Sequence, residues 1–121
     1  MITETKTRTV DPDITVLEIS GRLSMGNALQ SIETSIRRLI SEGVGKLVVD
    51  LSSLNYIDSS GIGLLVSCSG HIEQKGGHLR IAGAQSTVAR ALGVAHVDRI
   101  APVDADVESA CRHLAADGAS A

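Results

Sequence analysis

The chain has 121 residues, of which 43% are hydrophobic and 21% charged, and this length and balance predict one soluble globular domain. Its formal net charge of −3 and its scattered Lys and Arg residues argue against a nucleic-acid partner, which requires a clustered basic surface. No apolar run is long enough to span a membrane, and the polar residues 1–10 lack the apolar stretch of a secretory signal. We therefore expect no membrane insertion and a cytoplasmic location.

The aromatic, cysteine and histidine residues bear on the core, the redox compartment and possible metal binding. Tyr56 is the only aromatic residue, so the core must be built from aliphatic side chains, and a stacking surface for nucleobases is missing. Cys68 and Cys111 are far apart in the sequence, which fits two free thiols in a reducing compartment. The four histidines are dispersed singly, so we expect no metal site.

The first part of the chain predicts an antiparallel hairpin followed by a helix. Residues 3–9 alternate threonine with charged residues, which favours an exposed edge strand, and Ile14–Ser20 reads as a second strand. After a loop that contains Ser24, apolar residues recur at helical spacing up to Gly43. The expected apolar face of this helix consists of Leu29, Ile32, Ile36, Leu39 and Ile40.

The rest of the chain predicts strands and helices that alternate. Lys46–Leu51 is a continuous apolar strand, as expected for the buried middle of a parallel sheet. The further elements are expected in this order: a helix from Ser59 to the Gly76-Gly77 turn, a strand at Leu79–Ala82, a helix at Gln85–Leu92, an edge strand at Arg99–Val103 that contains Pro102, and a helix that starts at Asp104 or Asp106.

The complete pattern, β-β-α-β-α-β-α-β-α, predicts a single α/β domain over residues 1–121. Its sheet is expected to be mixed but mostly parallel, with about five strands, about four helices and an N-terminal antiparallel hairpin. The ordered core is expected at about residues 3–115, and residues 116–121, rich in alanine, glycine and serine, are expected to form a frayed tail.

The segment Asp58-Ser59-Ser60-Gly61-Ile62-Gly63 carries the candidate site. It places a carboxylate and two hydroxyls at the amino end of a helix, where free backbone N–H groups and the helix dipole stabilise an anion. A serine there can be phosphorylated and its dianion accommodated. Glycine in a helix costs about 0.5–1 kcal/mol relative to alanine, so we interpret Gly61 and Gly63 as positions that let a partner approach the backbone. A simple helix cap fits the same residues.

Residues 50–66, DLSSLNYIDSSGIGLLV, resemble the signature of the STAS domain (sulphate transporter and anti-sigma antagonist). The segment resembles in particular that of the anti-sigma factor antagonists of bacterial stress and sporulation control, and the resemblance extends over essentially the whole chain. The resemblance implies that Ser59 is the phosphorylated residue. It also implies that the partner-binding surface includes Asp58, Ser60, Gly61, Ile62, Gly63 and, at the first corner, Ser24.

The resemblance implies a regulator of transcription that catalyses nothing itself and needs no cofactor or metal. The unphosphorylated chain would bind an anti-sigma factor, a serine kinase of the histidine-kinase-like ATPase fold, and so free a sigma factor. Phosphorylation of Ser59 by that kinase would end the binding, and a metal-dependent serine phosphatase would reset the switch. The sequence leaves the oligomeric state open between a monomer and a weak dimer.

One departure from the family pattern keeps a second reading open. Family members that are kinase substrates often carry the sequence G-E-L-D at the first corner, whereas this chain has Gly21-Arg22-Leu23-Ser24. The alternative is therefore a STAS scaffold that is not phosphorylated, or an interaction module that accompanies a transporter.

Three other classes are disfavoured by the residues themselves. A receiver domain would need an acidic pair for magnesium after its first strand, and this chain lacks one. A dinucleotide-binding loop would need a third glycine where Val66 stands, and a serine hydrolase would need a G-x-S-x-G elbow around Ser59 or Ser60.

Overall fold

The first two strands pair as the alternating sequence predicts. The computed structural model describes residues 2–10 and 12–119, and in it β1 (Glu4–Val10) runs antiparallel to β2 (Ile14–Leu23). The other elements, in chain order, are α1 (Asn27–Ser41), β3 (Lys46–Asp50), β4 (Leu54–Ile57), α2 (Ser59–Gln74), β5 (His78–Ala82), α3 (Ser86–Val94), the 3₁₀ helix η1 (Val97–Arg99), β6 (Val103–Asp104) and α4 (Val107–Ala119).

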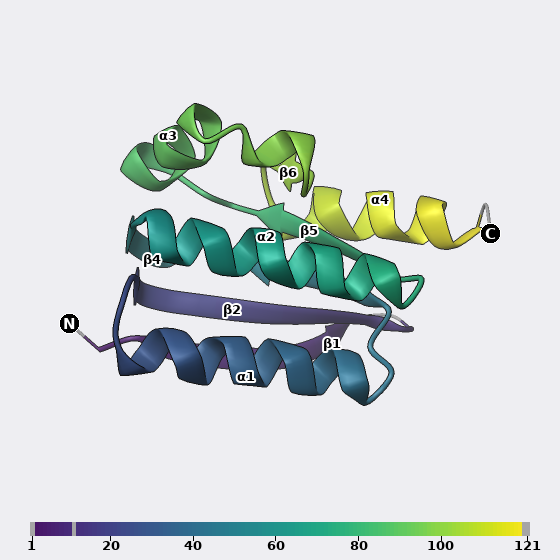
Figure 1. Cartoon of the computed structure of the whole chain (residues 1–121). Coiled ribbons are helices and arrows are strands. Elements are labelled where there is room, and N and C mark those ends of the chain that lie inside the picture. The colour runs from purple at the N-terminus through teal and green to yellow at the C-terminus, as the bar shows by residue number, and fades with distance from the viewer. Residues whose placement is uncertain (1, 11, 120–121) are drawn as a thin grey trace.

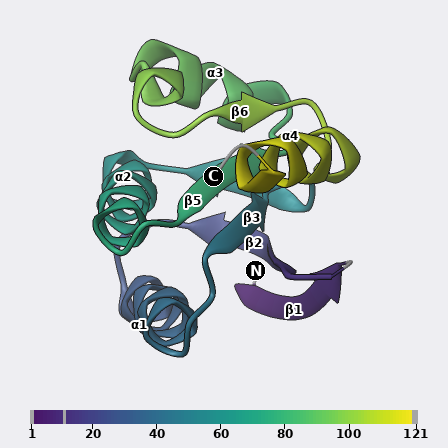
Figure 2. The same ribbon diagram turned by 90° about the vertical axis from the view of Figure 1, so that its right-hand side faces the viewer.

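The strands form one mixed sheet in the order β1-β2-β3-β5-β6, with β4 paired to the end of β2. Every pair other than β1 with β2 is parallel, which confirms the predicted α/β fold with its mostly parallel sheet and N-terminal hairpin. In Figures 1 and 2, α1 and α2 lie side by side on one face of the sheet, α4 covers the other face, and α3 lies at the β6 edge.

Two aliphatic clusters fill the space between the sheet and its helices. Successive side chains of a strand point to opposite faces, so Leu47 and Val49 of β3 face α1 and α2 whereas Val48 faces α4. The larger cluster includes the predicted α1 residues Ile32, Ile36 and Ile40, with Leu29 and Leu39 packed at its margin. The smaller cluster under α4 consists of Ile14, Val16, Val48, Ala82, Ala110 and Leu114.

β2 is longer than predicted, and the short strand β4 was not predicted. The chain continues past Ser20 through a register shift at Gly21 and Arg22, so that Leu23 pairs with Ile57. Gly21 has φ +91°, and a Cβ there would overlap the carbonyl oxygen of Ile2. β4 is short and follows a polar turn, so the sequence around it does not indicate a strand. It belongs to the sheet only through its pairing with the end of β2.

The predicted edge strand at Arg99–Val103 was wrong in its first part. Residues 97–99 form η1, and the amides of Ile100 and Ala101 both donate to the carbonyl oxygen of Val97, which keeps this stretch coiled. Pro102 has no amide hydrogen, and its carbonyl oxygen accepts a hydrogen bond from Ile81. Only Val103–Asp104 remains as a strand, at the edge of the sheet as predicted.

The end of the chain belongs to the last helix as far as the structure describes it. α4 extends to Ala119, into the segment predicted as a frayed tail, and residues 120–121 lie outside the described residues. Within residues 2–10 and 12–119, no helix combines the length and apolar character that a membrane span requires.

Candidate functional site

Ser59 is the first residue of α2, and its side chain is exposed. Asp58 caps the helix in an extended conformation, with its Oδ1 accepting a hydrogen bond of 3.0 Å from the amide of Gly61. Ser60, one residue further, is half-buried. The helix therefore begins where the sequence predicts, and of its two N-terminal hydroxyls that of Ser59 lies further into solvent.

Asp58 also connects the start of α2 to the loop between β2 and α1. Its Oδ2 accepts a hydrogen bond of 3.2 Å from the amide of Met25, and its own amide donates to the carbonyl oxygen of Leu23 at 3.3 Å. Ser24 lies between these two contacts and is thereby held beside the start of the helix. The amide of Gly61 is the main cause that lowers the pKa of Asp58, partial burial opposes it, and the amide of Met25 lowers the pKa further.

The two glycines of the segment have different surroundings. Gly61 is buried, and a Cβ there would overlap the carbonyl oxygen of Leu23 and lie 2.9 Å from Cγ1 of Ile57. Its role is the close packing of α2 against the strand ends, which corrects the interpretation that it opens the backbone to a partner. Gly63 is exposed, with nothing within 4 Å of an added Cβ, and Ile62 is half-buried against the larger cluster.

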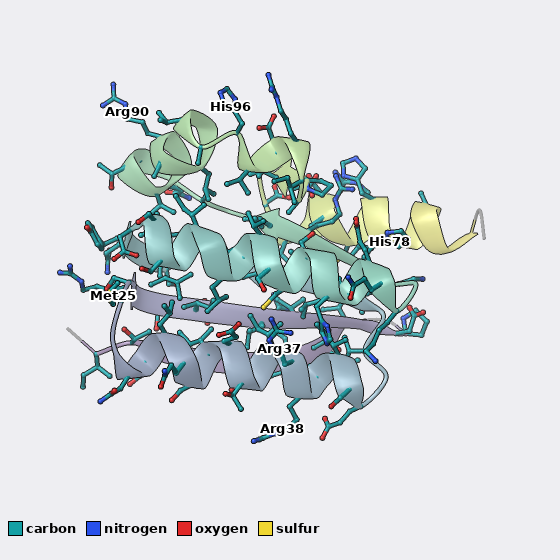
Figure 3. The ribbon with its side chains drawn as sticks, in the orientation of Figure 1. Met25, Arg37, Arg38, His78, Arg90 and His96 are labelled. Carbon is teal, nitrogen blue, oxygen red and sulfur yellow. The ribbon has the colours of Figure 1, made fainter. Side chains whose placement is uncertain are left out.

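Arg22 and Tyr56 form a second exposed feature beside this helix start. They are opposite each other in the β2–β4 pairing, and the Arg22 guanidinium carbon lies 4.4 Å from the centre of the Tyr56 ring. This distance is typical of a cation–π contact. Tyr56 is 43% exposed and Met25 is 79% exposed, and in Figure 3 Met25 lies at the end of the molecule where α1 begins.

We call the group of Arg22, Met25, Tyr56 and Ser59 the Ser59 face. Tyrosine, methionine and arginine are the residue types enriched at protein–protein interfaces. Arg22 stood out in the sequence only as a departure from the family pattern, and Met25 and Tyr56 were not predicted to belong to the site. A signal for Tyr56 was present, because the only aromatic residue stands between Leu54 and Ile57, both of which are buried, immediately before the helix cap.

The remaining candidate residues, Asp50 and the possible metal ligands, do not form a second site. The carboxylate of Asp50 is buried and accepts a hydrogen bond of 3.0 Å from the amide of Ser52, so it forms a turn at the end of β3. In the part of the chain that the structure describes, no three histidine, cysteine or acidic side chains are arranged to hold a metal ion.

A family model for the STAS domain matches residues 5–110. An anti-sigma factor antagonist from Mycobacterium paratuberculosis is 18% identical, with 93% of this chain and 94% of that chain covered at a TM-score of 0.82. The Bacillus cell fate determinant SpoIIAA in its phosphorylated form is 20% identical, with 91% and 98% covered at 0.70. The STAS domain of a SulP transporter from Vibrio cholerae is also 20% identical, with 93% and 89% covered at 0.69. Antagonists and transporter domains therefore share this fold.

Proposed function

This chain belongs to the STAS domain family, and from that membership we propose that it is an anti-sigma factor antagonist whose partner binding is switched by phosphorylation of Ser59. The observation that carries the proposal is the Asp58-Ser59-Ser60-Gly61 segment, with Ser59 exposed as the first residue of α2. The likeness to SpoIIAA, an anti-sigma factor antagonist that exists in a phosphorylated form, supports it. The chain is then the substrate and ligand of its partner, and the chemistry of phosphate transfer belongs to the partner.

The Ser59 face supplies the binding energy in the unphosphorylated state. Tyr56 and Met25 offer exposed apolar surface, and Arg22 adds one positive charge over the tyrosine ring. Family members often have acidic residues at this corner, so a partner matched to this chain presents neutral or acidic groups opposite Arg22. This substitution gives the chain its own partner specificity within the family.

Phosphorylation of Ser59 adds about −1.5 to −2 charges at this face. The carboxylate of Asp58 already carries a negative charge there, since its lowered pKa keeps it ionised at neutral pH. Burying an unpaired dianion under a partner costs several kcal/mol, and each 1.4 kcal/mol weakens binding about tenfold. We therefore expect the phosphorylated chain to release its partner with an affinity loss of about a hundredfold or more, without a change of fold.

The proposal is tested by substitution of the two neighbouring hydroxyls. Ser59→Ala protein, used as bait in an extract of the source cells, is expected to retain a serine kinase of the histidine-kinase-like ATPase fold. That kinase should phosphorylate the unmodified chain and the matched Ser60→Ala control, but not Ser59→Ala, as located by mass spectrometry. Ser59→Asp should bind the kinase about a hundredfold more weakly than Ser59→Ala in calorimetry.

Two outcomes would contradict the switch. Phosphate located on Ser60 would assign the reaction to the other hydroxyl. Equal affinity of Ser59→Ala and Ser59→Asp, or recovery of membrane transport components in place of a kinase, would favour the scaffold or transporter-accessory module. A metal-dependent phosphatase that restores binding of the phosphorylated chain would complete the cycle.

A further inference from the structure

A groove of about 590 Å³ lies between α1 and α2, away from the Ser59 face. It follows the second halves of the two helices, which lie side by side and end at the same end of the molecule, opposite to Met25 (Figures 1 and 3). Its lining consists of Thr34, Arg37, Arg38, Ser41, His71 and Lys75. Three of these six side chains are permanent cations and none is a carboxylate, in a protein whose net charge is −3.

The cations of the groove differ in how they are held. Arg37 points toward α2 (Figure 3), donates a hydrogen bond of 2.9 Å to the hydroxyl of Ser67 and pairs with Glu33 at 3.3 Å. Arg38 also lines the groove, but its side chain extends from the side of α1 that is away from α2 (Figure 3). For Arg38 and Lys75, the described part of the chain contains no carboxylate in ion-pair contact. Their charges are therefore available to a ligand.

The shape of the lining favours an extended ligand over a compact one. Thr34, Arg37, Arg38 and Ser41 share one side of α1, because Thr34 and Ser41 each lie three and four residues from the two arginines, and together they form a stripe about 10 Å long. The cations of the groove stand on separate side chains of two helices and do not converge on one point. Carboxylates spaced along a peptide reach the separate cations better than one phosphate group does.

From this arrangement we propose that the α1/α2 groove binds an acidic peptide segment of a partner protein, through charge complementarity with Arg37, Arg38 and Lys75. This site lies beyond the proposed switch, because it uses neither Ser59 nor any residue of the Ser59 face. Its ligand is recognised by a row of carboxylates, and the binding weakens with salt because the charges on both sides are exposed.

The test is a titration of the isotope-labelled chain with a short glutamate-rich peptide, followed by NMR. Amide shifts are expected at residues 34–41 and 71–75 and not around Ser59. Charge reversal in Arg38→Glu/Lys75→Glu is expected to weaken the binding about tenfold or more. The matched control is Arg90→Glu/Arg99→Glu, which makes the same change of net charge on α3 and η1, where Arg90 points away from the molecule (Figure 3). It should change the affinity less than about twofold.

Cations near a helix C-terminus also stabilise the helix, so circular dichroism must show that the charge-reversed protein is folded. If the charge-reversed protein is unfolded, the milder variant Arg38→Gln/Lys75→Gln replaces it in the test. Its affinity for the peptide is expected to be about threefold lower than that of the unmodified chain. Equal losses in the groove and control variants would overturn the proposal, as would amide shifts outside the groove. Tighter binding of inorganic phosphate or of phosphatidylglycerol vesicles at the same amides would assign the groove to phosphate chemistry and overturn it as well.

Discussion

Asp58 shows how much of the site depends on a single side chain. One of its oxygens caps α2 through Gly61, the other holds the loop at Met25, and both bonds go to backbone amides that have no other side-chain acceptor among the described residues. The start of α2, the loop that contains Ser24 and the end of β2 are thereby fixed to one another. Ser59 therefore stands on a rigid base, as the proposed switch requires of a residue that would meet an enzyme and a partner in turn.

The two glycines of the segment give the first prediction at this scale. Gly61→Ala forces a methyl group onto the carbonyl oxygen of Leu23, and we expect it to lower the free energy of unfolding by about 3 kcal/mol. Gly63→Ala, its matched control, enters open space on an exposed helix position and should raise the free energy of unfolding by about 0.5–1 kcal/mol. Urea unfolding followed by far-ultraviolet circular dichroism measures both, and equal effects of the two substitutions would refute the packing role of Gly61.

Among the elements, β5, β6 and α4 are joined by a group of three side chains. Asp104 is buried and accepts hydrogen bonds from Arg80 at 2.6 Å and from His113 at 2.7 Å. Burial alone would raise the pKa of Asp104, but the hydrogen bonds from Arg80 and His113 outweigh it, so the pKa lies below the ordinary value of 3.8. This group fixes α4 to the edge of the sheet, where β6 contributes only two residues.

The lowered pKa of Asp104 sets the sign of a pH dependence. Its contribution to stability is fully present above about pH 5 and is lost as the pH falls through the folded-state pKa, because the unfolded state takes up the proton first. Asp104→Asn is therefore expected to lose about 3 kcal/mol at neutral pH and much less in acid. Urea titrations at several pH values measure the difference from the unmodified chain. The control Asp98→Asn changes an exposed residue of η1, and its free energy of unfolding should stay within about 0.5 kcal/mol of that of the unmodified chain. If the stability of Asp104→Asn varied with pH in parallel with that of the unmodified chain, the assignment to Asp104 would be wrong.

The elements also show how far the sequence alone could lead. Helical spacing predicted the α1 face at Ile32, Ile36 and Ile40, and the cap residues predicted the start of α2, because both signals are local. The pairing of Leu23 with Ile57, the contact of Arg22 with Tyr56 and the basic groove depend on segments that meet only after folding. No periodicity within either segment encodes such pairings, so β4 and most of the Ser59 face were not predicted.

At the scale of the whole molecule, the two faces of the sheet are stabilised unequally. Among the side chains that the structure describes, the cluster under α1, α2 and α3 contains 21 buried residues, whereas that under α4 contains six, two of them alanines. Burial of apolar area is the main stabilising contribution of a domain, at about 25 cal/mol per Å². The α4 layer is therefore the less stable of the two, and Asp104 supplies part of what its apolar contacts lack.

Native-state hydrogen exchange tests this inequality. The amides of Ala110 and Leu114 in α4 are expected to open with a free energy about 2 kcal/mol below that of Leu65 and Cys68 in α2, because α4 can detach while the larger cluster stays intact. Asp104→Asn should widen this gap. Identical opening free energies in the two helices, in the unmodified chain and in the variant, would show that the domain opens only as one unit.

The placement of Tyr56 has a practical consequence. Most small domains keep their aromatic rings in the interior, so that intrinsic emission reports on unfolding, but here the single ring stands outside the core, under a guanidinium on the Ser59 face. The fluorescence of Tyr56 should therefore respond to whatever covers the Ser59 face, and it should change little when only the interior is perturbed. Binding of a partner to the proposed switch can therefore be measured by tyrosine fluorescence, without a dye, a tag or an engineered tryptophan.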